Sequence, residues 1–452
     1  MRIELRRVVL PEFGIPVERP AITTTEYEQR ARALYEAVGL DWVVVYGDRE
    51  HFGNLVWLSG YDPRFEEALL LLGPRDQRVL LVGIEGVAYA EVTGLPVDVR
   101  FYHPFSIQGQ PHVDSPPLEE LLREVGLDRV SRVGVVGWKS LDPGETDDPT
   151  VPAFVPAFIL RALNRITEAP ALDVTAAMTD AERGLRTRNS AAQIALFEWG
   201  AARSSAAVMR VVRGARPGMT ELEAAGLLGY QGEPVTMHPI VAASNGVLNG
   251  LRSPSSRVIS RGEAISCGVG YWGGLTCRAG LLLDQPDEEF VASLVRPYYT
   301  AIATWWTTVG IGVSGGELDA AVRNACAGAL FGSFVNAGHL TSYDEWIGSP
   351  VRTGSTQRVA SGMMMQCDII PSPVPPGRFL NCEDTLVIGD ESVREMLARE
   401  HPAVWSRIEA RRAFMRDELG LRLRPEVLPL SSAPAYLPPF WLASDLVCVV
   451  DS

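Results

Sequence analysis

The chain has 452 residues, a length that predicts two domains and an extension rather than one domain. With 46% hydrophobic and 21% charged residues, its composition is that of a globular protein and excludes a disordered chain. A net charge of −14 argues against nucleic acid or an anionic membrane surface as the main partner.

The first residues contain no apolar stretch of signal-peptide length, and no later segment has the apolar run of a membrane span. The six cysteines include no Cys-x-x-Cys pair, so they do not predict a disulfide framework. We therefore expect a cytoplasmic protein without a membrane partner.

Residues 1–180 alternate between helical and strand patterns, as in an α/β domain. An amphipathic helix is predicted over residues 24–39, and a buried strand over residues 41–47. Residues 67–83 predict a hairpin, because a Gly-Pro-Arg-Asp turn separates two apolar runs. Further helices are expected near 85–93 and 117–125, and a strand at 130–137.

Residues 181–395 change to the pattern of an α+β domain with antiparallel strands. A long amphipathic helix opens this domain, and a second helix follows in which Thr220 and Glu223 have the spacing of a capping box. Short strands dominate from residue 235 onward, with long helices near 286–309 and 315–330. Residues 396–452 predict a helix and a Pro-rich extension that wraps a neighbouring part of the chain or a partner subunit.

Short motifs along the chain follow the order found in one protein family. They are EYEQRARALYEAVGLDWVVVYGDREHFGNLVWLSGY, GLRTRNSAAQIALFEWGA, GARPGMTELE, PIVAASNG, ISRGEAIS, NAGHL, VASGMMMQCDIIP and NCEDTLVIGDE. Together they resemble the creatinase, aminopeptidase P and prolidase family over residues 20–395. The resemblance implies a creatinase-type N-terminal α/β domain followed by a pita-bread catalytic domain, with a curved sheet flanked by helices. It also implies a homodimer, since dimers are common among creatinase-like members.

Metal-dependent members of this family hold two ions with two Asp, one His and two Glu, a donor set that suits Mn, Co or Zn. The resemblance places the histidine at His339 and the second glutamate at Glu383, while the first glutamate is shortened to Asp368. The two aspartate positions fall on Gly268 and Leu275, in a hairpin that is shorter than in the family and lacks a carboxylate. We therefore predict no bound metal, and leave open one ion held by the three remaining residues.

Without a metal, His339 or His238 is expected to carry protons as general base and then general acid. Glu383 and Asp368 would bind a cationic or amide group of the substrate. Each residue also has a structural interpretation. The histidines can be satisfied loop or turn residues, and the carboxylates can pair with arginines.

Candidate substrate-binding side chains lie close to these motifs. Arg278 follows the second lost aspartate, and can bind a substrate carboxylate or pair with Asp368 or Glu383. Three aromatic residues can line an apolar pocket or can pack in the interior, namely Trp272, Tyr343 and Trp346.

Four cysteines stand beside the family's ligand positions. Cys267 and Cys277 flank the shortened hairpin, and either can be a nucleophile activated by histidine, a thiolate ligand or a small buried residue. Cys367 and Cys382 precede Asp368 and Glu383. Since neighbouring strand residues face opposite sides, these two cysteines lie in the core if the carboxylates face the substrate.

Three functions remain open. We favour a metal-independent hydrolase of a C–N bond in a small molecule, such as an amide, an N-acyl amino acid or a guanidino compound of specialised metabolism. The alternatives are a metal-dependent Xaa-Pro aminopeptidase or dipeptidase, and a non-catalytic pseudo-enzyme that binds a peptide or protein. Retention of His339 and Glu383 argues against the pseudo-enzyme, and the loss of both aspartates argues against the metallopeptidase.

Overall fold

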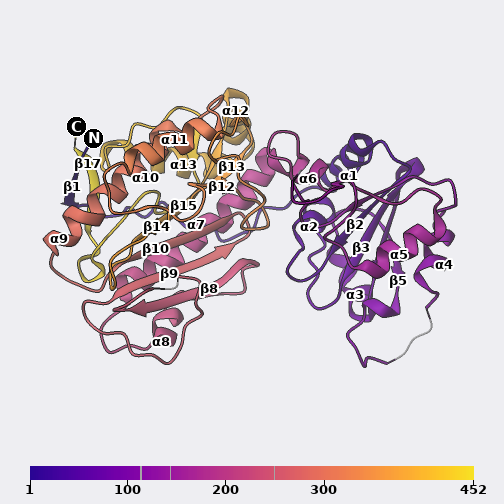
Figure 1. Cartoon of the computed structure of the whole chain (residues 1–452), viewed down its shortest axis with the longest axis horizontal. Helices are drawn as coiled ribbons and strands as arrows, with labels where there is room; N and C mark the ends of the chain where they lie inside the picture. Colours follow the sequence, from indigo (N-terminus) through magenta and orange to yellow (C-terminus); the bar gives the residue numbers. More distant parts are fainter. Residues whose placement is uncertain (112–114, 143, 249, 452) are drawn as a thin grey trace. The chain divides into compact units, whose positions relative to one another are not determined.

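The computed structural model describes residues 1–111, 115–142, 144–248 and 250–451. The chain forms two compact units, each with its own sheet (Figure 1). The smaller unit is Ile22–Thr187, and the larger unit joins Met1–Ala21 to Arg188–Ser452.

The smaller unit is built on a six-stranded sheet with the order β5-β4-β3-β2-β6-β7. The hairpin expected at 67–83 is present as β3 and β4, which pair antiparallel. The outer pairs are parallel, and the central strands are buried along nearly their whole length, which explains their unbroken apolar runs. The elements are α1 (Thr24–Val38), β2 (Trp42–Gly47), α2 (Gly53–Ser59), β3 (Ala68–Gly73), β4 (Gln77–Val82), α3 (Ile84–Tyr89), β5 (Asp98–Phe101), α4 (Leu118–Glu124), β6 (Val133–Val136), α5 (Ala157–Ile166), β7 (Leu172–Asp173) and α6 (Ala176–Thr179).

The larger unit contains an antiparallel sheet with the order β12-β13-β15-β10-β9-β8, and β16 also pairs with β15. The capping box expected at Thr220 and Glu223 is present at the start of α8. The first strand, β1 (Arg2–Arg7), pairs with the last, β17 (Leu446–Asp451). The elements between them in this unit are α7 (Ala191–Gly214), α8 (Glu221–Gly226), β8 (Val235–Ser244), β9 (Ala264–Tyr271), β10 (Gly274–Leu281), α9 (Glu288–Phe290), α10 (Arg296–Thr308), α11 (Gly315–Ala325), β11 (Gly332–Ser333), β12 (His339–Leu340), β13 (Met364–Cys367), β14 (Pro371–Ser372), β15 (Asn381–Ile388), α12 (Glu391–Glu400), α13 (Pro402–Asp417) and β16 (Val427–Pro429).

The boundaries of the two units differ from those expected from the sequence. The sequence predicts that residues 1–21 belong to the first domain, but they belong to the larger unit because β1 pairs antiparallel with β17. Residues 396–452 were expected to be an extension, but they also pack within the larger unit. A strand pairing between the two ends of a chain has no local sequence signal, so the pattern of residues 1–21 could not indicate it.

The two faces of the larger sheet have different environments. On one face Thr276 meets α7, where its Oγ1 lies 3.3 Å from the Oγ of Ser204. We call this side the helix face, and alternation along β10 places Arg278 on it as well. The opposite side, which we call the inner face, carries Cys277 and its cross-strand partner Glu383.

The Pro-rich tail packs on the helix face of its own unit. Arg278 donates from Nε to the carbonyl oxygen of Tyr436 at 2.8 Å, and its guanidinium pairs with Asp384. The Asp384 carboxylate also accepts from the Ser431 hydroxyl and from the backbone N–H of Ala435. The tail therefore completes the buried environment of an ion pair. Across the described residues, no helix is long and apolar enough to cross a membrane.

Candidate functional site

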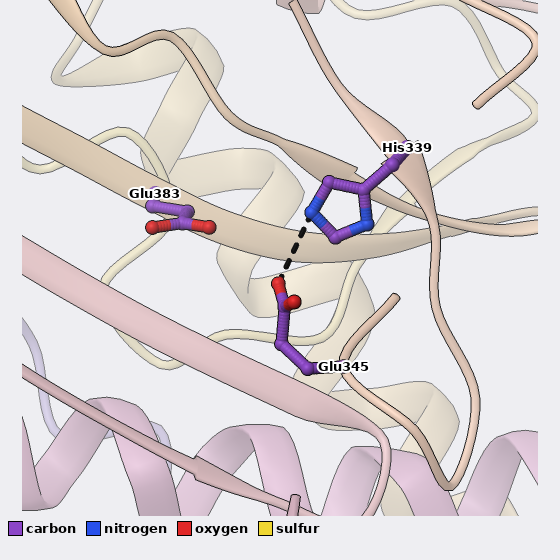
Figure 2. A group of neighbouring side chains, drawn as sticks. All are labelled: His339, Glu345 and Glu383. Carbon is purple, nitrogen blue, oxygen red and sulfur yellow. Dashed lines mark ion pairs between the residues drawn. The ribbon is translucent and has the colours of Figure 1, made fainter. Parts of the chain in front are cut away.

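Three side chains converge beside the inner face of the larger sheet (Figure 2). His339, Glu345 and Glu383 each offer one ligand atom, and these atoms lie within 4.8 Å of one another. Asp368 joins them, since its Oδ2 lies 4.0 Å from Nε2 of His339. We call these four residues the His-carboxylate cluster.

Strand register brings three members of this cluster together from distant parts of the chain. His339 pairs with Gln366, and Gln366 pairs with Thr385. Continuing the register of β13 and β15 by one residue sets Asp368 opposite Glu383. Gly338 permits the close approach of β12, because a Cβ there would lie 2.6 Å from the carbonyl oxygen of Gln366.

Glu345 reaches the cluster from a tight loop between β12 and Gly348. The backbone N–H of Leu340 donates to the carbonyl of Gly348 at 2.8 Å, and that of Ile347 donates back to Leu340 at 3.0 Å. These bonds close the loop and direct Glu345 toward His339. The next residue, Trp346, stacks on the imidazole with ring centroids 4.1 Å apart.

His339 is fully buried and its two ring nitrogens have different environments. Nδ1 donates to the carbonyl of Leu340 at 3.2 Å, which leaves Nε2 directed at the carboxylates. Nε2 lies 3.1 Å from Oε1 of Glu345, although the geometry is not that of a hydrogen bond. Burial lowers the pKa of His339, but the charges of Glu345 and Asp368 raise it more, so the net shift is upward.

The buried carboxyls of the cluster hold their protons more tightly than usual. Burial, together with the charges of Asp368 and Glu345, raises the pKa of Glu383 well above its ordinary value. Burial raises the pKa of Asp368 to about 7, against the opposing effect of His339. Gln366 donates to Oε1 of Glu383 at 3.3 Å, but among the described residues no arginine pairs with the cluster. When these carboxyls are ionised, their negative charge is therefore only partly compensated.

His238 does not lie with the other predicted catalytic residues. It is exposed on β8, at an irregularity in the pairing with β9. β8 is the edge strand at the opposite end of the sheet from β12, with four strands between them. The expectation that His238 points into the same pocket as His339 is therefore wrong.

Three of the predicted substrate-binding residues lie in the interior. Arg278 is fully buried on the helix face and pairs with Asp384 rather than with Asp368 or Glu383. Trp272 and Tyr343 are buried against each other, with ring centroids 4.9 Å apart. Neither these rings nor the guanidinium is placed to meet a substrate, whereas Trp346 is 42% exposed beside the cluster.

The cysteines divide between the two faces. Cys367 and Cys382 lie on the helix face, as expected if their neighbours Asp368 and Glu383 face the other way. Cys267 shares the helix face, and Cys277 lies on the inner face beside Glu383. Burial raises the pKa of both hairpin thiols, so they are neutral near pH 7 and lack the activation that a nucleophile needs.

The hairpin cannot hold the second ion of the family. A Cβ at Gly268 would lie 3.2 Å from Sγ of Cys277 and from Ile240, so larger side chains already fill the space beside it. Leu275 offers no donor atom. The His-carboxylate cluster does offer donors for one ion, and it includes Glu345, which the sequence analysis missed. Its only signal was the pair of carboxylates, Asp344 and Glu345, within the stretch YDEWIG.

No family model matches the chain, and no curated protein matches it in sequence. Solved structures do match its fold. An Xaa-Pro dipeptidase from Bacillus anthracis aligns with a TM-score of 0.61 at 15% identity, covering 82% of this chain and 96% of its own. Dipeptidase PepE from Mycobacterium ulcerans gives 0.61 at 22% identity, covering 81% and 94%.

An X-Pro aminopeptidase from Thermotoga maritima also gives a TM-score of 0.61, at 18% identity, covering 80% of this chain and 95% of its own. These alignments cover 80–82% of this chain, so they include residues of both units. The chain therefore has the pita-bread fold of the prolidases and aminopeptidase P, as the order of its motifs predicted.

Proposed function

We propose that this chain is a hydrolase that cleaves a C–N bond in a small molecule such as an amide, an N-acyl amino acid or a guanidino compound. The His-carboxylate cluster carries this proposal. Buried groups with shifted pKa values that share one site are typical of catalytic centres. The proteins of similar fold are named as peptidases, and a peptide bond is also a C–N bond.

Hydrolysis requires one proton to move from water to the leaving nitrogen as the C–N bond breaks. Asp368 is placed for this step, since it is buried in the cluster and its Oδ1 has no hydrogen-bond partner. The Leu340 carbonyl orients the imidazole through Nδ1, and Trp346 covers one face of the ring. The excess of carboxylates favours a substrate that presents a cationic or N–H-rich group.

The fold implies two metal ions at this site, and the described residues offer donors for one of them. His339, Glu345 and Glu383 would hold one ion, which would lower the pKa of a bound water and so provide the nucleophile. The metal-independent reaction favoured by the sequence remains the competing prediction, and there His339 itself carries the proton. The sequence favours the metal-independent reaction because the two aspartates are lost, but Glu345 adds a carboxylate that this reasoning does not count.

The test is turnover by the purified chain on a panel of N-acyl amino acids, guanidino compounds and Xaa-Pro dipeptides. Asp368→Asn should lower turnover of the cleaved substrate by about 10²–10⁴-fold, the usual contribution of a positioned proton carrier. His238→Ala is the matched control and should keep full turnover, because this residue lies on the opposite edge strand. Full turnover by both Asp368→Asn and His339→Ala would contradict the proposed site.

Binding of a peptide without turnover of any substrate would instead support the pseudo-enzyme. The homodimer also remains a proposal that rests on the resemblance, and light scattering of the purified chain tests it.

A further inference from the structure

We propose that the larger unit binds a single divalent cation through His339, Glu345 and Glu383, with Glu345 replacing the aspartate ligands that the hairpin has lost. The inference rests on the same cluster as the proposed function and specifies its cofactor. It concerns binding, so it can be tested without any knowledge of the substrate.

The first observation is the convergence of donor atoms. One imidazole nitrogen and two carboxylate oxygens lie within 4.8 Å of one another, and they come from β12, β15 and the loop after β12 (Figure 2). Mixed imidazole and carboxylate ligands suit Zn²⁺, Mn²⁺ and Co²⁺. Three protein ligands also leave positions open for water or substrate, as in catalytic sites.

The second observation is independent of the first and concerns hydrogen bonding. Nε2 of His339 is completely buried and has no hydrogen bond of normal geometry, although Glu345 lies near it. Nδ1 donates to the Leu340 carbonyl, the arrangement that fixes the ring of a metal-binding histidine and leaves a lone pair on Nε2. The buried Oδ1 of Asp368 likewise has no partner. A cation between these groups would satisfy Oδ1 of Asp368 and would take the place of the ion pair between Nε2 and Glu345.

The third observation is the balance of charge. Glu345, Asp368 and Glu383 surround one imidazole, and no arginine pairs with them among the described residues. On the helix face the buried Asp384 accepts hydrogen bonds from Arg278, a hydroxyl and a backbone N–H. The protein thus surrounds a buried carboxylate with a cation and hydrogen-bond donors where the role is structural. A divalent cation would supply the missing positive charge in the cluster.

One ion is expected rather than two. The positions of the lost ligands are Gly268 and Leu275. A Cβ at Gly268 would lie 3.2 Å from Ile240 and from Cys277, so these side chains already fill the space where a ligand would stand.

The experiment loads the purified full chain with Zn²⁺, Mn²⁺ or Co²⁺ in turn. Elemental analysis after gel filtration measures the stoichiometry, titration calorimetry measures the affinity, and the visible absorption of bound Co²⁺ reports the ligand set. We expect one ion per chain. Glu345→Gln should weaken binding by at least about 10–100-fold, the range seen even for groups that only support a ligand, and should change the Co²⁺ spectrum.

Asp344→Asn is the matched control, since it removes a carboxylate from the same loop outside the donor group, and it should bind as the parent does. Circular dichroism confirms that both variants are folded. Less than a tenth of an ion per chain, or equal binding by the parent and Glu345→Gln, would overturn the proposal. Turnover that persists in the metal-free chain would overturn the assignment of the ion as the cofactor of the reaction, while leaving the hydrolase intact. Stoichiometric binding without turnover of any substrate would support the ion site and contradict the proposed function.

Discussion

The two faces of the larger sheet both bury carboxylates, but they treat them differently. On the helix face, Asp384 meets Arg278 and also accepts from the Ala435 backbone and the Ser431 hydroxyl. On the inner face, the Glu383 carboxyl accepts from Gln366 at 3.3 Å and lies near further carboxylates rather than an arginine. Asp384 and Glu383 are adjacent in the sequence. Burial alone therefore does not identify a functional carboxylate, and the partners of the group do.

The same substitution on the two faces should have different effects on the free energy of unfolding. Asp384→Asn leaves the Arg278 guanidinium buried without a counter-charge, and the free energy of unfolding should fall by about 3–5 kcal/mol. Asp368→Asn leaves no arginine unpaired and should cost no stability. Urea denaturation measures both. The exposed pair Arg261–Asp284 provides a control, in which Asp284→Asn should cost about 1 kcal/mol or less. Similar losses in the two buried variants would contradict the comparison.

Removing the ionisable group of Glu383 should change the free energy of unfolding less than Asp384→Asn does, and in the opposite direction. Because burial already raises the pKa of this carboxyl, Glu383→Gln replaces an unfavourable group with a neutral one of similar shape. The free energy of unfolding of the metal-free chain should stay unchanged or rise by about 1 kcal/mol. A fall in the free energy of unfolding of more than about 1 kcal/mol in urea denaturation would indicate that Glu383 has a compensating partner.

The smallest effect is expected for the thiol on the inner face. Cys277 lies beside Glu383, but burial keeps it protonated, so Cys277→Ala should change turnover by less than about tenfold. Cys367→Ala, on the helix face, provides a variant matched in burial and chemistry. If only Cys277→Ala abolished turnover, the thiol would take part in the reaction and the division between the faces would need revision.

Much of the fold could be predicted because its signals are local. The apolar runs around Gly-Pro-Arg-Asp predicted the β3–β4 hairpin, and the spacing of Thr220 and Glu223 predicted the cap of α8. Alternation along strands predicted that Cys367 and Cys382 face away from Asp368 and Glu383. These features depend on neighbouring residues only.

The errors concern features that only tertiary structure sets. Glu345 was overlooked because its direction depends on the closure of a loop between Leu340 and Gly348. His238 was expected at the site because the sequence does not reveal that β8 is the far edge of the sheet. Arg278 was expected to bind a substrate carboxylate or to pair with Asp368 or Glu383. Its ion-pair partner is instead Asp384, which follows Glu383 in the strand and therefore faces the opposite side of the sheet.

The pairing of β1 with β17 has a consequence for how the protein is made. Arg2 pairs with Asp451, so β1 leaves the ribosome long before its partner strand β17 is made. The smaller unit, Ile22–Thr187, is synthesised between them and can fold as soon as it emerges. During translation the smaller unit would therefore be folded while β1 is still unpaired, and the larger unit would be completed only once β17 has been made.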